Sequence, residues 1–561
     1  MTDAAAVPQT ETALDGATVI ARSLKEQGVE YMFGIVGFPV FGIARAAQKE
    51  GIRYLGFRNE QAASYAAGAV GYLTGRPGAC LAVSGPGMIH GIAGLANAWS
   101  NCWPMILLGG ANDSYQNGRG AFQEAPQVEA ARPFVKYAAR PDRLSRVPFY
   151  IEQAVRTSMY GRPGATYIDL PNDIITDKID EAELEARERC PDPPKSLADP
   201  AQVERAVAAL KSAERPLVIV GKGAAYAAAA DEVRRLLEST QMPFLPTPMG
   251  KGVVPDDHPL SIAPARSHAL QNADVILLIG GRLNWILHFG SQPRFAPDVR
   301  ILQIDIAAEE MGNNVTPEAA LVGDARSVVG QINALLAEDP WQLPAASLWR
   351  SALAENVERN RAAVEAMEAD DSEPMGYYRA LRAVREAAPR DAIFVCEGAN
   401  TMDISRTVLP NYEPKHRLDA GTFGTMGVGT GLALAAAVVH PDKKVVCVQG
   451  DSAFGFSGME VEVACRYELP ITFVVINNNG IGGGVSELDR ERGIPASVYT
   501  PNAHYEKVIE AFGGKGYFVT SPGDLEDALR IAIADETPSL VNVMIDPKAS
   551  RRPQKFEWLT R

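Results

Sequence analysis

Two polar side chains follow neighbouring apolar segments in the C-terminal third of the sequence. Asp451 comes directly after the run VVCVQG, and Asn478 follows the run ITFVVIN. A carboxylate, an amide oxygen and a backbone carbonyl such as that of Gly480 are hard oxygen ligands, which suit a Mg²⁺ ion that also binds water and phosphate oxygens. Gly450 and Gly455 would let the backbone approach a phosphate closely. The residues predict a magnesium–phosphate site, although an ordinary sheet edge with polar loop ends explains an isolated pair of this kind equally well.

The surrounding segments are predicted to place both side chains on one edge of a sheet. The apolar, β-rich runs Val445–Val448 and Ile471–Ile476 flank a segment with helical periodicity. Ser457 followed by Glu460 has the spacing of a capping box, so we expect the helix to start at Ser457. Two strands joined by such a crossover must be parallel. Ligands of open α/β sheets bind at the carboxyl edge, where both side chains would lie.

Bulk properties limit the class of protein. The chain has 561 residues, 46% of them apolar and 22% charged, and its net charge is −14. This length predicts three domains of about 150–190 residues. The negative charge argues against a nucleic-acid partner, and no apolar run approaches the roughly 18 residues that span a membrane. The N-terminus lacks the layout of a secretory signal, and the six cysteines form no CxxC pairs. We therefore expect a cytoplasmic protein without a membrane segment.

Short apolar strands alternate with helical segments along most of the chain, which predicts α/β domains with largely parallel sheets. The first and third of these stretches have a similar strand–helix rhythm. A proline-rich, charged linker over 183–200 and a charged helical tether over 338–375 separate them. The expected parts are domains at 1–185, 200–340 and 375–547 and a C-terminal lid at 548–561.

A second candidate site begins at Glu60, in the stretch FRNEQAASYAAGAVGYLTGRPGACLAVSGPG. Alone, Glu60 is explained as a helix N-terminal carboxylate that the helix dipole stabilises. Together with GDS at 450–452 and the Asn pair that contains Asn478, however, this stretch resembles the thiamine diphosphate-dependent enzymes. There the matching glutamate hydrogen-bonds the aminopyrimidine ring and promotes ionisation of the thiazolium carbon. The usual form of the motif is GDG, and GDS is also met in the branch that uses coenzyme A thioesters.

The resemblance implies three open parallel-sheet α/β domains: a pyrimidine-binding, a Rossmann-like central and a diphosphate-binding domain. It also implies thiamine diphosphate and Mg²⁺ as cofactors, with the metal held by Asp451, Asn478 and the carbonyl of Gly480. The cofactor-binding residues would be Glu60, Ser84, Gly424, Met426, Gly450, Asp451, Ser452, Ala453, Asn478, Gly480 and Ile481.

Met426 lies in the loop GTFGTMGVG, before an alanine-rich segment. By itself, a methionine here is explained as core filling. The resemblance implies instead that Met426 wedges between the two rings of the cofactor and that the carbonyl of Gly424 accepts from its amine. Bending the cofactor in this way brings its reacting groups together.

The middle of the chain indicates the branch of the family. GKGAAY at 221–226 ends in Tyr226 where a dinucleotide fingerprint has glycine, so we expect no dinucleotide site there. The stretch 260–290 resembles the coenzyme A-using members, namely oxalyl-CoA decarboxylases and 2-hydroxyacyl-CoA lyases. Arg266 matches an arginine that binds the nucleotide end of coenzyme A, although a solvated surface arginine is the plain alternative. The tail KASRRPQKFEWLTR resembles that of the lyases and would close over the thioester.

The implied reaction is reversible cleavage of a 2-hydroxyacyl-CoA to formyl-CoA and an aldehyde or ketone. Decarboxylation of oxalyl-CoA is the alternative. Acetohydroxyacid synthase-like carboligation ranks third: those synthases share the FQE of this chain, so FQE does not exclude them, but they also use FAD, which nothing in this sequence demands. Oxalyl-CoA decarboxylases tend to carry Tyr-Glu where this chain has Phe122-Gln123. The substrate-binding residues would be Gly37, Phe122, Gln123, Arg266, Asn400, Ser550, Arg551 and Arg552.

The segment after Ile481 differs from many relatives, which have a tyrosine where this chain has Gly482. The missing ring would leave room for a short or branched substrate such as 2-hydroxyisobutyryl-CoA. Glu487 and Glu491 follow on this glycine-rich segment and are candidates for proton transfer, with Gln123 orienting the substrate. A solvated charged loop is the alternative. The resemblance further implies a homodimer at minimum, and a homotetramer of two such dimers.

Overall fold

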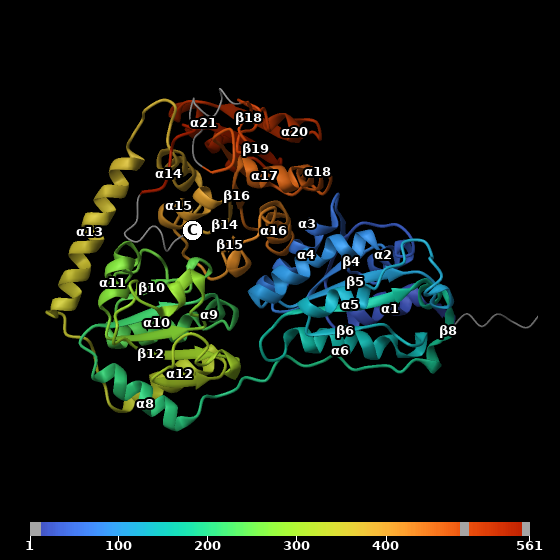
Figure 1. Cartoon of the computed structure of the whole chain (residues 1–561), viewed down its shortest axis with the longest axis horizontal. Helices are drawn as coiled ribbons and strands as arrows, with labels where there is room; N and C mark the ends of the chain where they lie inside the picture. The colour runs from blue at the N-terminus through green and yellow to red at the C-terminus, as the bar shows by residue number, and fades with distance from the viewer. Residues whose placement is uncertain (1–12, 483–492, 553–561) are drawn as a thin grey trace, which may run out of the picture. The chain divides into compact units, whose positions relative to one another are not determined.

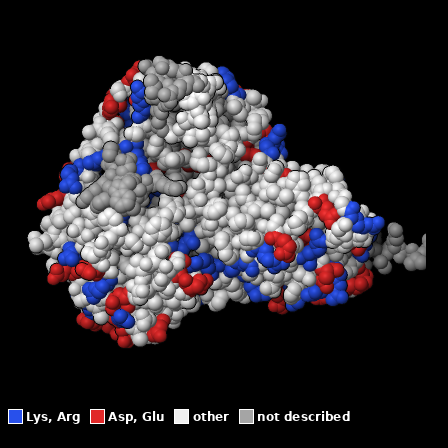
Figure 2. All heavy atoms as spheres, in the orientation of Figure 1, with Lys and Arg blue, Asp and Glu red and all other residues white. Residues whose placement is uncertain are grey.

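The computed structural model describes residues 13–482 and 493–552. The chain divides into two compact units, Met1–Pro193 and Pro194–Arg561, and each is described by itself. In the described ranges no helix combines the length and apolar character needed to cross a bilayer. Acidic and basic side chains are interspersed over the face drawn in Figure 2.

The first unit is built on a six-stranded parallel sheet in the order β3-β2-β4-β5-β7-β6 (Figure 1). A small antiparallel pair, β1 with β8, joins the beginning of this unit to its end. The strands are β1 (Ala13–Asp15), β2 (Tyr31–Gly34), β3 (Arg53–Gly56), β4 (Gly78–Ala82), β5 (Met105–Ala111), β6 (Tyr137–Ala139), β7 (Ala165–Pro171) and β8 (Lys178–Asp180).

Side chains alternate between the two faces of this sheet, as expected of buried strands. Met32, Leu81 and Ile106 pack into one core beneath α1, α2 and α6, while their neighbours point to the face that α3 and α4 cover. The helices are α1 (Gly16–Glu26), α2 (Phe41–Lys49), α3 (Glu60–Thr74), α4 (Pro86–Asn101), α5 (Gln127–Ala131), α6 (Val147–Met159) and α7 (Asn172–Thr176).

The second unit contains two sheets. The central one has five parallel strands in the order β10-β9-β11-β12-β13. Its strands are β9 (Pro216–Val220), β10 (Phe244–Pro246), β11 (Val275–Ile279), β12 (Arg300–Asp305) and β13 (Ala319–Val322). Its helices are α8 (Pro200–Lys211), α9 (Lys222–Tyr226), α10 (Ala230–Thr240), α11 (Arg266–Asn272), α12 (Ala325–Glu338) and α13 (Leu348–Glu368).

The C-terminal sheet has six parallel strands in the order β15-β14-β16-β17-β19-β18. Its strands are β14 (Ile393–Glu397), β15 (Arg417–Asp419), β16 (Val445–Gly450), β17 (Ile471–Asn477), β18 (Lys515–Val519) and β19 (Ser539–Met544). Its helices are α14 (Tyr377–Ala387), α15 (Ala399–Val408), α16 (Gly429–Val439), α17 (Asp451–Ser457), α18 (Val461–Arg466), α20 (Glu506–Glu510) and α21 (Pro522–Ala534).

Strand order identifies where ligands would bind. Counted along the chain, both six-stranded sheets follow the order 2-1-3-4-6-5, which explains their similar sequence rhythm. In each sheet the chain adds its second strand on one side of the first strand and its third strand on the other side. Ligands of open α/β sheets bind outside the carboxyl ends of the strands at such a switch point. The switch points lie at the ends of β2 and β4 in the first unit and of β14 and β16 in the second.

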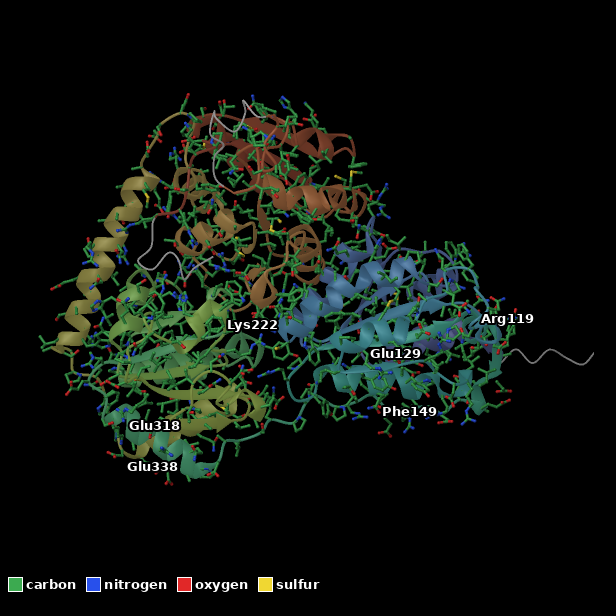
Figure 3. All side chains as sticks on the ribbon, viewed as in Figure 1. Arg119, Glu129, Phe149, Lys222, Glu318 and Glu338 are labelled. Carbon is green, nitrogen blue, oxygen red and sulfur yellow. The ribbon has the colours of Figure 1, made fainter. Side chains whose placement is uncertain are left out.

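At the switch point of the central sheet, the loops after β9 and β11 contact each other through their backbones. Lys222, labelled in Figure 3, begins α9 after β9. The amide of Gly223 donates to the carbonyl of Gly280 at 2.9 Å, and a Cβ on Gly221 would lie 2.3 Å from that same oxygen. The glycines of this loop therefore serve close packing between the ends of β9 and β11.

Candidate active site

Asp451 and Asn478 lie beside each other at the carboxyl edge of the C-terminal sheet, as predicted. They follow β16 and β17, which pair in parallel with Gly450 opposite Ile476. The predicted helix start was wrong, because α17 begins at Asp451 and Ser457 is its last residue. The Ser457 hydroxyl donates to Oγ1 of Thr430 at 3.2 Å instead of capping a helix. Because β16 ends at Gly450 and the chain turns directly into α17, the helix starts before the residues of the capping pattern are reached.

Asp451 is a buried carboxylate, 2% exposed. Its Oδ1 accepts from the amide of Ser452 at 2.8 Å, and its Oδ2 accepts from the amide of Gly480 at 2.9 Å, so it joins the two loops. Burial raises the pKa of Asp451 to about 6, even though these backbone amides favour the ionised form. Within the described ranges no lysine, arginine or histidine forms an ion pair with it, so a bound cation would supply the missing charge.

Asn478 is oriented so that its oxygen is available. Its Nδ2 donates to the carbonyl of Gly482 at 2.7 Å and lies 3.4 Å from the hydroxyl of Tyr377. Gly482 has a φ of +80°, a left-handed conformation that favours glycine. The left-handed turn at Gly482 therefore closes the loop onto Asn478.

The other predicted residues of this edge surround the pair. The Tyr377 hydroxyl also bonds the side chain of Asn400, at the start of α15, and burial raises the pKa of Tyr377 to about 12. The Ser452 hydroxyl lies 3.1 Å from that of Tyr499, and Ala453 is buried next to it. Ile481 is half-exposed, and its amide donates to Ser497 O at 2.7 Å.

The loop that carries Gly424 and Met426 is held from two sides. A fully buried carboxylate, Glu397 at the end of β14, accepts from the amides of Gly427, Val428 and Gly429, the last at 2.7 Å. From the central domain, Nε1 of Trp285 donates to Thr422 O at 2.7 Å, and Arg282 donates to the Thr422 hydroxyl at 3.2 Å. Gly424 itself has a φ of +67°, and Met426 is partly exposed next to it.

The first unit gathers its predicted residues at its own switch point. Glu60 begins α3 as predicted, and its Oε1 lies against Gly87, where a Cβ would be 3.1 Å away. A Cβ on Gly37 would lie 2.7 Å from the side chain of Val83, next to the buried Ser84.

The loop of Phe122 and Gln123 closes this edge of the first unit. The Ser84 hydroxyl donates to Oε1 of Gln123 at 3.0 Å, and the ring of Phe122 packs edge-on against Phe38 with centroids 6.0 Å apart. Gln123 adopts a φ of +56°, which turns the loop back toward Gly85. The structure thus brings Gly37, Glu60, Ser84 and Gln123 together within one unit.

Four arginines gather where the central and C-terminal domains of the second unit meet. Nη2 of Arg266 donates to the carbonyl of Ile286 at 2.9 Å. The pKa of Arg266 is lowered to about 10, first by burial and then by the charges of Arg294 and Arg406. Asp403 is shared, accepting from Arg406 at 2.7 Å and from Arg551 at 2.9 Å. Arg406 also reaches Asp419 at 3.3 Å. Since Arg266 donates to acceptors other than a carboxylate, this arginine cluster (Arg266, Arg294, Arg406, Arg551) has a local excess of positive charge.

His288 belongs to the same cluster as a neutral acceptor. Burial, followed by the charges of Arg266 and Arg294, lowers the pKa of His288 to about 4. Its Nε2 lies 3.3 Å from Nη1 of Arg266, which can only donate. Arg266 is therefore a constrained, half-buried arginine and not the freely solvated one of the plain alternative.

The remaining predicted residues are divided. Arg551 joins the arginine cluster. The amide of Arg552 donates to the hydroxyl of Tyr378 in α14 at 3.2 Å, and its side chain donates to Oδ1 of Asn360 in α13 at 3.5 Å. Ser550 is exposed. Glu487 and Glu491 lie outside the described residues, as does the lid beyond 552.

Three family models match the sequence in the order of its sheets. They are "Thiamine pyrophosphate enzyme, N-terminal TPP binding domain" over residues 14–130, "central domain" over 203–332 and "C-terminal TPP binding domain" over 397–543. The chain belongs to the thiamine pyrophosphate enzymes. Its three α/β sheets are the three domains of that family, and thiamine diphosphate is the cofactor that membership implies.

Individual relatives cover the whole chain. It is 53% identical to 2-hydroxyacyl-CoA lyase 1 of Homo sapiens, across 100% of both chains. It is 44% identical to 2-hydroxyacyl-CoA lyase of Arabidopsis thaliana, across 98% of both, and 42% identical to oxalyl-CoA decarboxylase of Escherichia coli (strain K12), across 95% of both.

The residues present fit the cofactor of this family of thiamine pyrophosphate enzymes. Among residues 13–482 and 493–552, no side-chain cation pairs with the buried Asp451, and the amide orientation of Asn478 leaves its oxygen unoccupied by the contacts described above. No three His, Cys, Asp or Glu side chains come together in the described residues, so a cation here would rely on amide and backbone oxygens.

Sequence reasoning missed Glu397, Tyr377, Arg294 and Arg406. Each acts on residues far along the chain, and none stands in a short motif. Glu397 had one local signal, a carboxylate that ends an apolar run and precedes glycine, in IFVCEGAN.

Proposed function

We propose that this enzyme cleaves 2-hydroxyacyl-CoA thioesters to formyl-CoA and an aldehyde or ketone, in a reversible reaction. The observation that carries the proposal is the arginine cluster, on the same unit as the Asp451 edge. Coenzyme A brings phosphate groups, which arginines bind through charge-assisted hydrogen bonds. Full-length similarity to 2-hydroxyacyl-CoA lyases supports the acyl part of the substrate.

In this proposal the two switch points hold the two ends of the cofactor. Asp451, the Asn478 oxygen and the Gly480 carbonyl would hold Mg²⁺ and through it the diphosphate, next to Gly450, Ser452, Ala453 and Ile481. Glu60 would hold the pyrimidine, with Gly424 and Met426 fixing its bend. When bound, thiamine diphosphate supplies a nucleophilic carbon that also stabilises the negative charge left after the C–C bond breaks.

The substrate would be oriented by Gln123, Gly37 and Asn400, with Phe122 beside them. Ser84 fixes the Gln123 oxygen at 3.0 Å, so the Gln123 amide nitrogen is the group directed to substrate oxygens. The thioester would be bound by Ser550, Arg551 and Arg552.

Proton transfer would be carried out by Glu487 or Glu491. Substitution of either glutamate by glutamine should then lower turnover at least a hundredfold, which is roughly the contribution of a general acid or base.

Decarboxylation of oxalyl-CoA is the second candidate, favoured by the 42% identity to oxalyl-CoA decarboxylase. Both substrates share coenzyme A, so the arginine cluster does not separate them. The exposed Phe122 beside Gln123 offers fewer groups for a second carboxylate than Tyr-Glu would, which favours the lyase reaction.

We propose a homodimer at minimum, assembled to a tetramer of two dimers, in the cytoplasm. The residues around both switch points include exposed apolar side chains. In the first unit these are Phe38, Phe41, Ile89 and Phe122, and in the second Phe423, Phe456 and Met459. Covering such surfaces against a second copy would be favourable.

The coenzyme A site is tested by Arg266→Gln. Loss of one charge-assisted hydrogen bond should raise KM for the acyl-CoA about tenfold or more, with kcat nearly unchanged. Arg235→Gln is the matched control, because Arg235 is an exposed arginine of α10 paired with Glu232 at 3.1 Å. Equal KM values for the two variants would place the coenzyme A site elsewhere.

A further inference from the structure

A histidine contacts the glutamate at the centre of the first unit. Nδ1 of His90, in α4, lies 3.1 Å from Oε2 of Glu60. Glu60 is 9% exposed, whereas the His90 side chain is 59% exposed. One imidazole thus connects this buried carboxylate to the surface of the unit.

The Glu60 side chain is confined on its other sides. Its Oε1 faces the first turn of α4, where a Cβ on Gly87 would be 3.1 Å away. The Cys80 thiol of β4 is a titratable group close enough to interact with Glu60 electrostatically. Burial, reinforced by the charge of Glu60, raises the pKa of Cys80 far above its usual range, so this thiol stays neutral. An imidazole, by contrast, ordinarily exchanges protons with water near neutral pH.

We propose that His90 is a positioning residue for Glu60 and the route by which Glu60 exchanges protons with water. The inference rests on the proposed function, in which Glu60 binds the pyrimidine of thiamine diphosphate. With Oε2 held by His90, Oε1 is the oxygen that remains for the cofactor. No role was predicted for His90 from the sequence.

The proton balance is simple. Nε2 of neutral His90 takes a proton from hydronium or buffer, which forms one N–H bond. The Nδ1–H bond then breaks as its proton moves to Oε2 of Glu60, which forms one O–H bond. The reverse sequence carries a proton from Glu60 to water, and no oxidant, reductant or further co-reactant is needed.

The test compares His90→Asn and His90→Leu with Glu60→Gln. Asparagine places a donor nitrogen where Nδ1 lies but does not titrate, whereas leucine removes the donor as well. Two properties are measured on cofactor-loaded protein without substrate: the rate at which the thiazolium hydrogen exchanges for deuterium, and the pH midpoint of the near-ultraviolet circular dichroism of the bound cofactor. Affinity for thiamine diphosphate is measured separately.

His90→Asn should bind thiamine diphosphate like wild type and still exchange hydrogen at least about tenfold more slowly, because the proton route is lost. His90→Leu should also bind the cofactor about tenfold more weakly. A donor or cation beside Glu60 favours the ionised carboxylate. Its removal in His90→Leu should let Glu60 and the bound pyrimidine keep their shared proton to a higher pH, so the pH midpoint of the circular dichroism should rise by about one unit.

His504→Gln is the matched control. The Nδ1 of His504 lies 2.6 Å from Glu506, and the pair has a similar contrast of exposure, 56% against 3%. This variant loses the same kind of contact and should leave both readouts unchanged.

The outcomes separate the two proposals. Wild-type exchange in Glu60→Gln would overturn the proposed function and this inference with it. Slow exchange in Glu60→Gln together with wild-type exchange and midpoint in both His90 variants would overturn the inference alone. Complete rescue of both readouts by asparagine would overturn the proton route.

Discussion

Asp451 connects burial to cofactor chemistry at the scale of a single residue. Its pKa is raised to about 6 by burial, so the ionised form is disfavoured in the folded, metal-free protein. For an acid with a raised pKa, this cost grows as pH rises from the ordinary value of about 4 and is complete above about 6. A divalent cation binds the ionised carboxylate and offsets the cost.

Metal binding should therefore depend on pH with a known sign. Below about pH 6, Mg²⁺ must displace a proton from Asp451, so Mg²⁺ affinity should fall roughly tenfold per pH unit. The measurement is the rise in Tm caused by Mg²⁺ and thiamine diphosphate between pH 5 and 8. The rise should be large at pH 7–8 and shrink at pH 5.

Asp451→Asn is the control for this pH series. It keeps the shape of the side chain, lacks the titrating oxygen and should show a small Tm rise at every pH. A wild-type rise that is the same at pH 5 and pH 8 would contradict the role of Asp451.

At this scale the sequence predicted residues that follow strands and failed for residues that act across the fold. Asp451, Asn478 and Glu60 each stand at the end of a strand or the start of a helix, so local pattern places them. Arg406 meets Arg266 only because α15 and α11 belong to neighbouring domains of one unit, and no spacing in the sequence encodes that.

In the proposed function the 421–429 loop would set the shape of the cofactor, and this loop is held by Glu397. Three backbone amides point at this carboxylate, and a Cβ on Gly429 would lie 2.6 Å from its Oε2. Burial raises the pKa of Glu397 to about 7, while the amides and Gln449 favour its ionised form. The loop is therefore held by one acceptor group that a neutral amide cannot replace.

Glu397→Gln should loosen the loop, because the new NH₂ group faces backbone donors. We expect a loss of about 2 kcal/mol in the free energy of unfolding and at least about tenfold weaker thiamine diphosphate binding. Urea unfolding and cofactor titration measure the two effects.

Glu368→Gln separates loop positioning from general stability. Glu368 is also buried, but it binds Arg385 through two contacts of 2.7 Å, away from the 421–429 loop. This control should lose stability while retaining cofactor affinity. If both variants keep wild-type affinity, Glu397 is only a structural carboxylate.

Elements themselves were largely predictable, because buried parallel strands appear as short apolar runs. The order of those strands was not, since pairing is decided by packing of helices on both faces. The expected helix start at Ser457 was wrong for a related reason. The sheet fixes the end of β16 at Gly450, so α17 begins at the next residue, and Ser457 donates to Thr430 instead.

At the scale of the whole molecule, the proposed function assigns one half of the cofactor site to the switch point of each unit. If the halves come from different chains, two inactive variants should rescue each other. In a mixed dimer of Glu60→Gln and Asp451→Ala, one site carries both defects and the other carries none. Random reassociation should then restore about a quarter of wild-type activity.

The measurement is activity after joint unfolding and refolding of the two variants, with sedimentation to confirm the dimer or tetramer. Each variant refolded alone is the control. Activity that stays at the level of the controls, or a fully active monomer in sedimentation, would contradict an intermolecular site.

The central claim is the reaction itself, and mass spectrometry of products tests it most directly. The purified enzyme, with thiamine diphosphate and Mg²⁺, is given linear and branched 2-hydroxyacyl-CoAs and oxalyl-CoA. We predict formyl-CoA with the matching aldehyde or ketone from the 2-hydroxyacyl-CoAs, including acetone from 2-hydroxyisobutyryl-CoA, and no product once both cofactors are removed. Carbon dioxide from oxalyl-CoA with no cleavage of any 2-hydroxyacyl-CoA would contradict the proposed function.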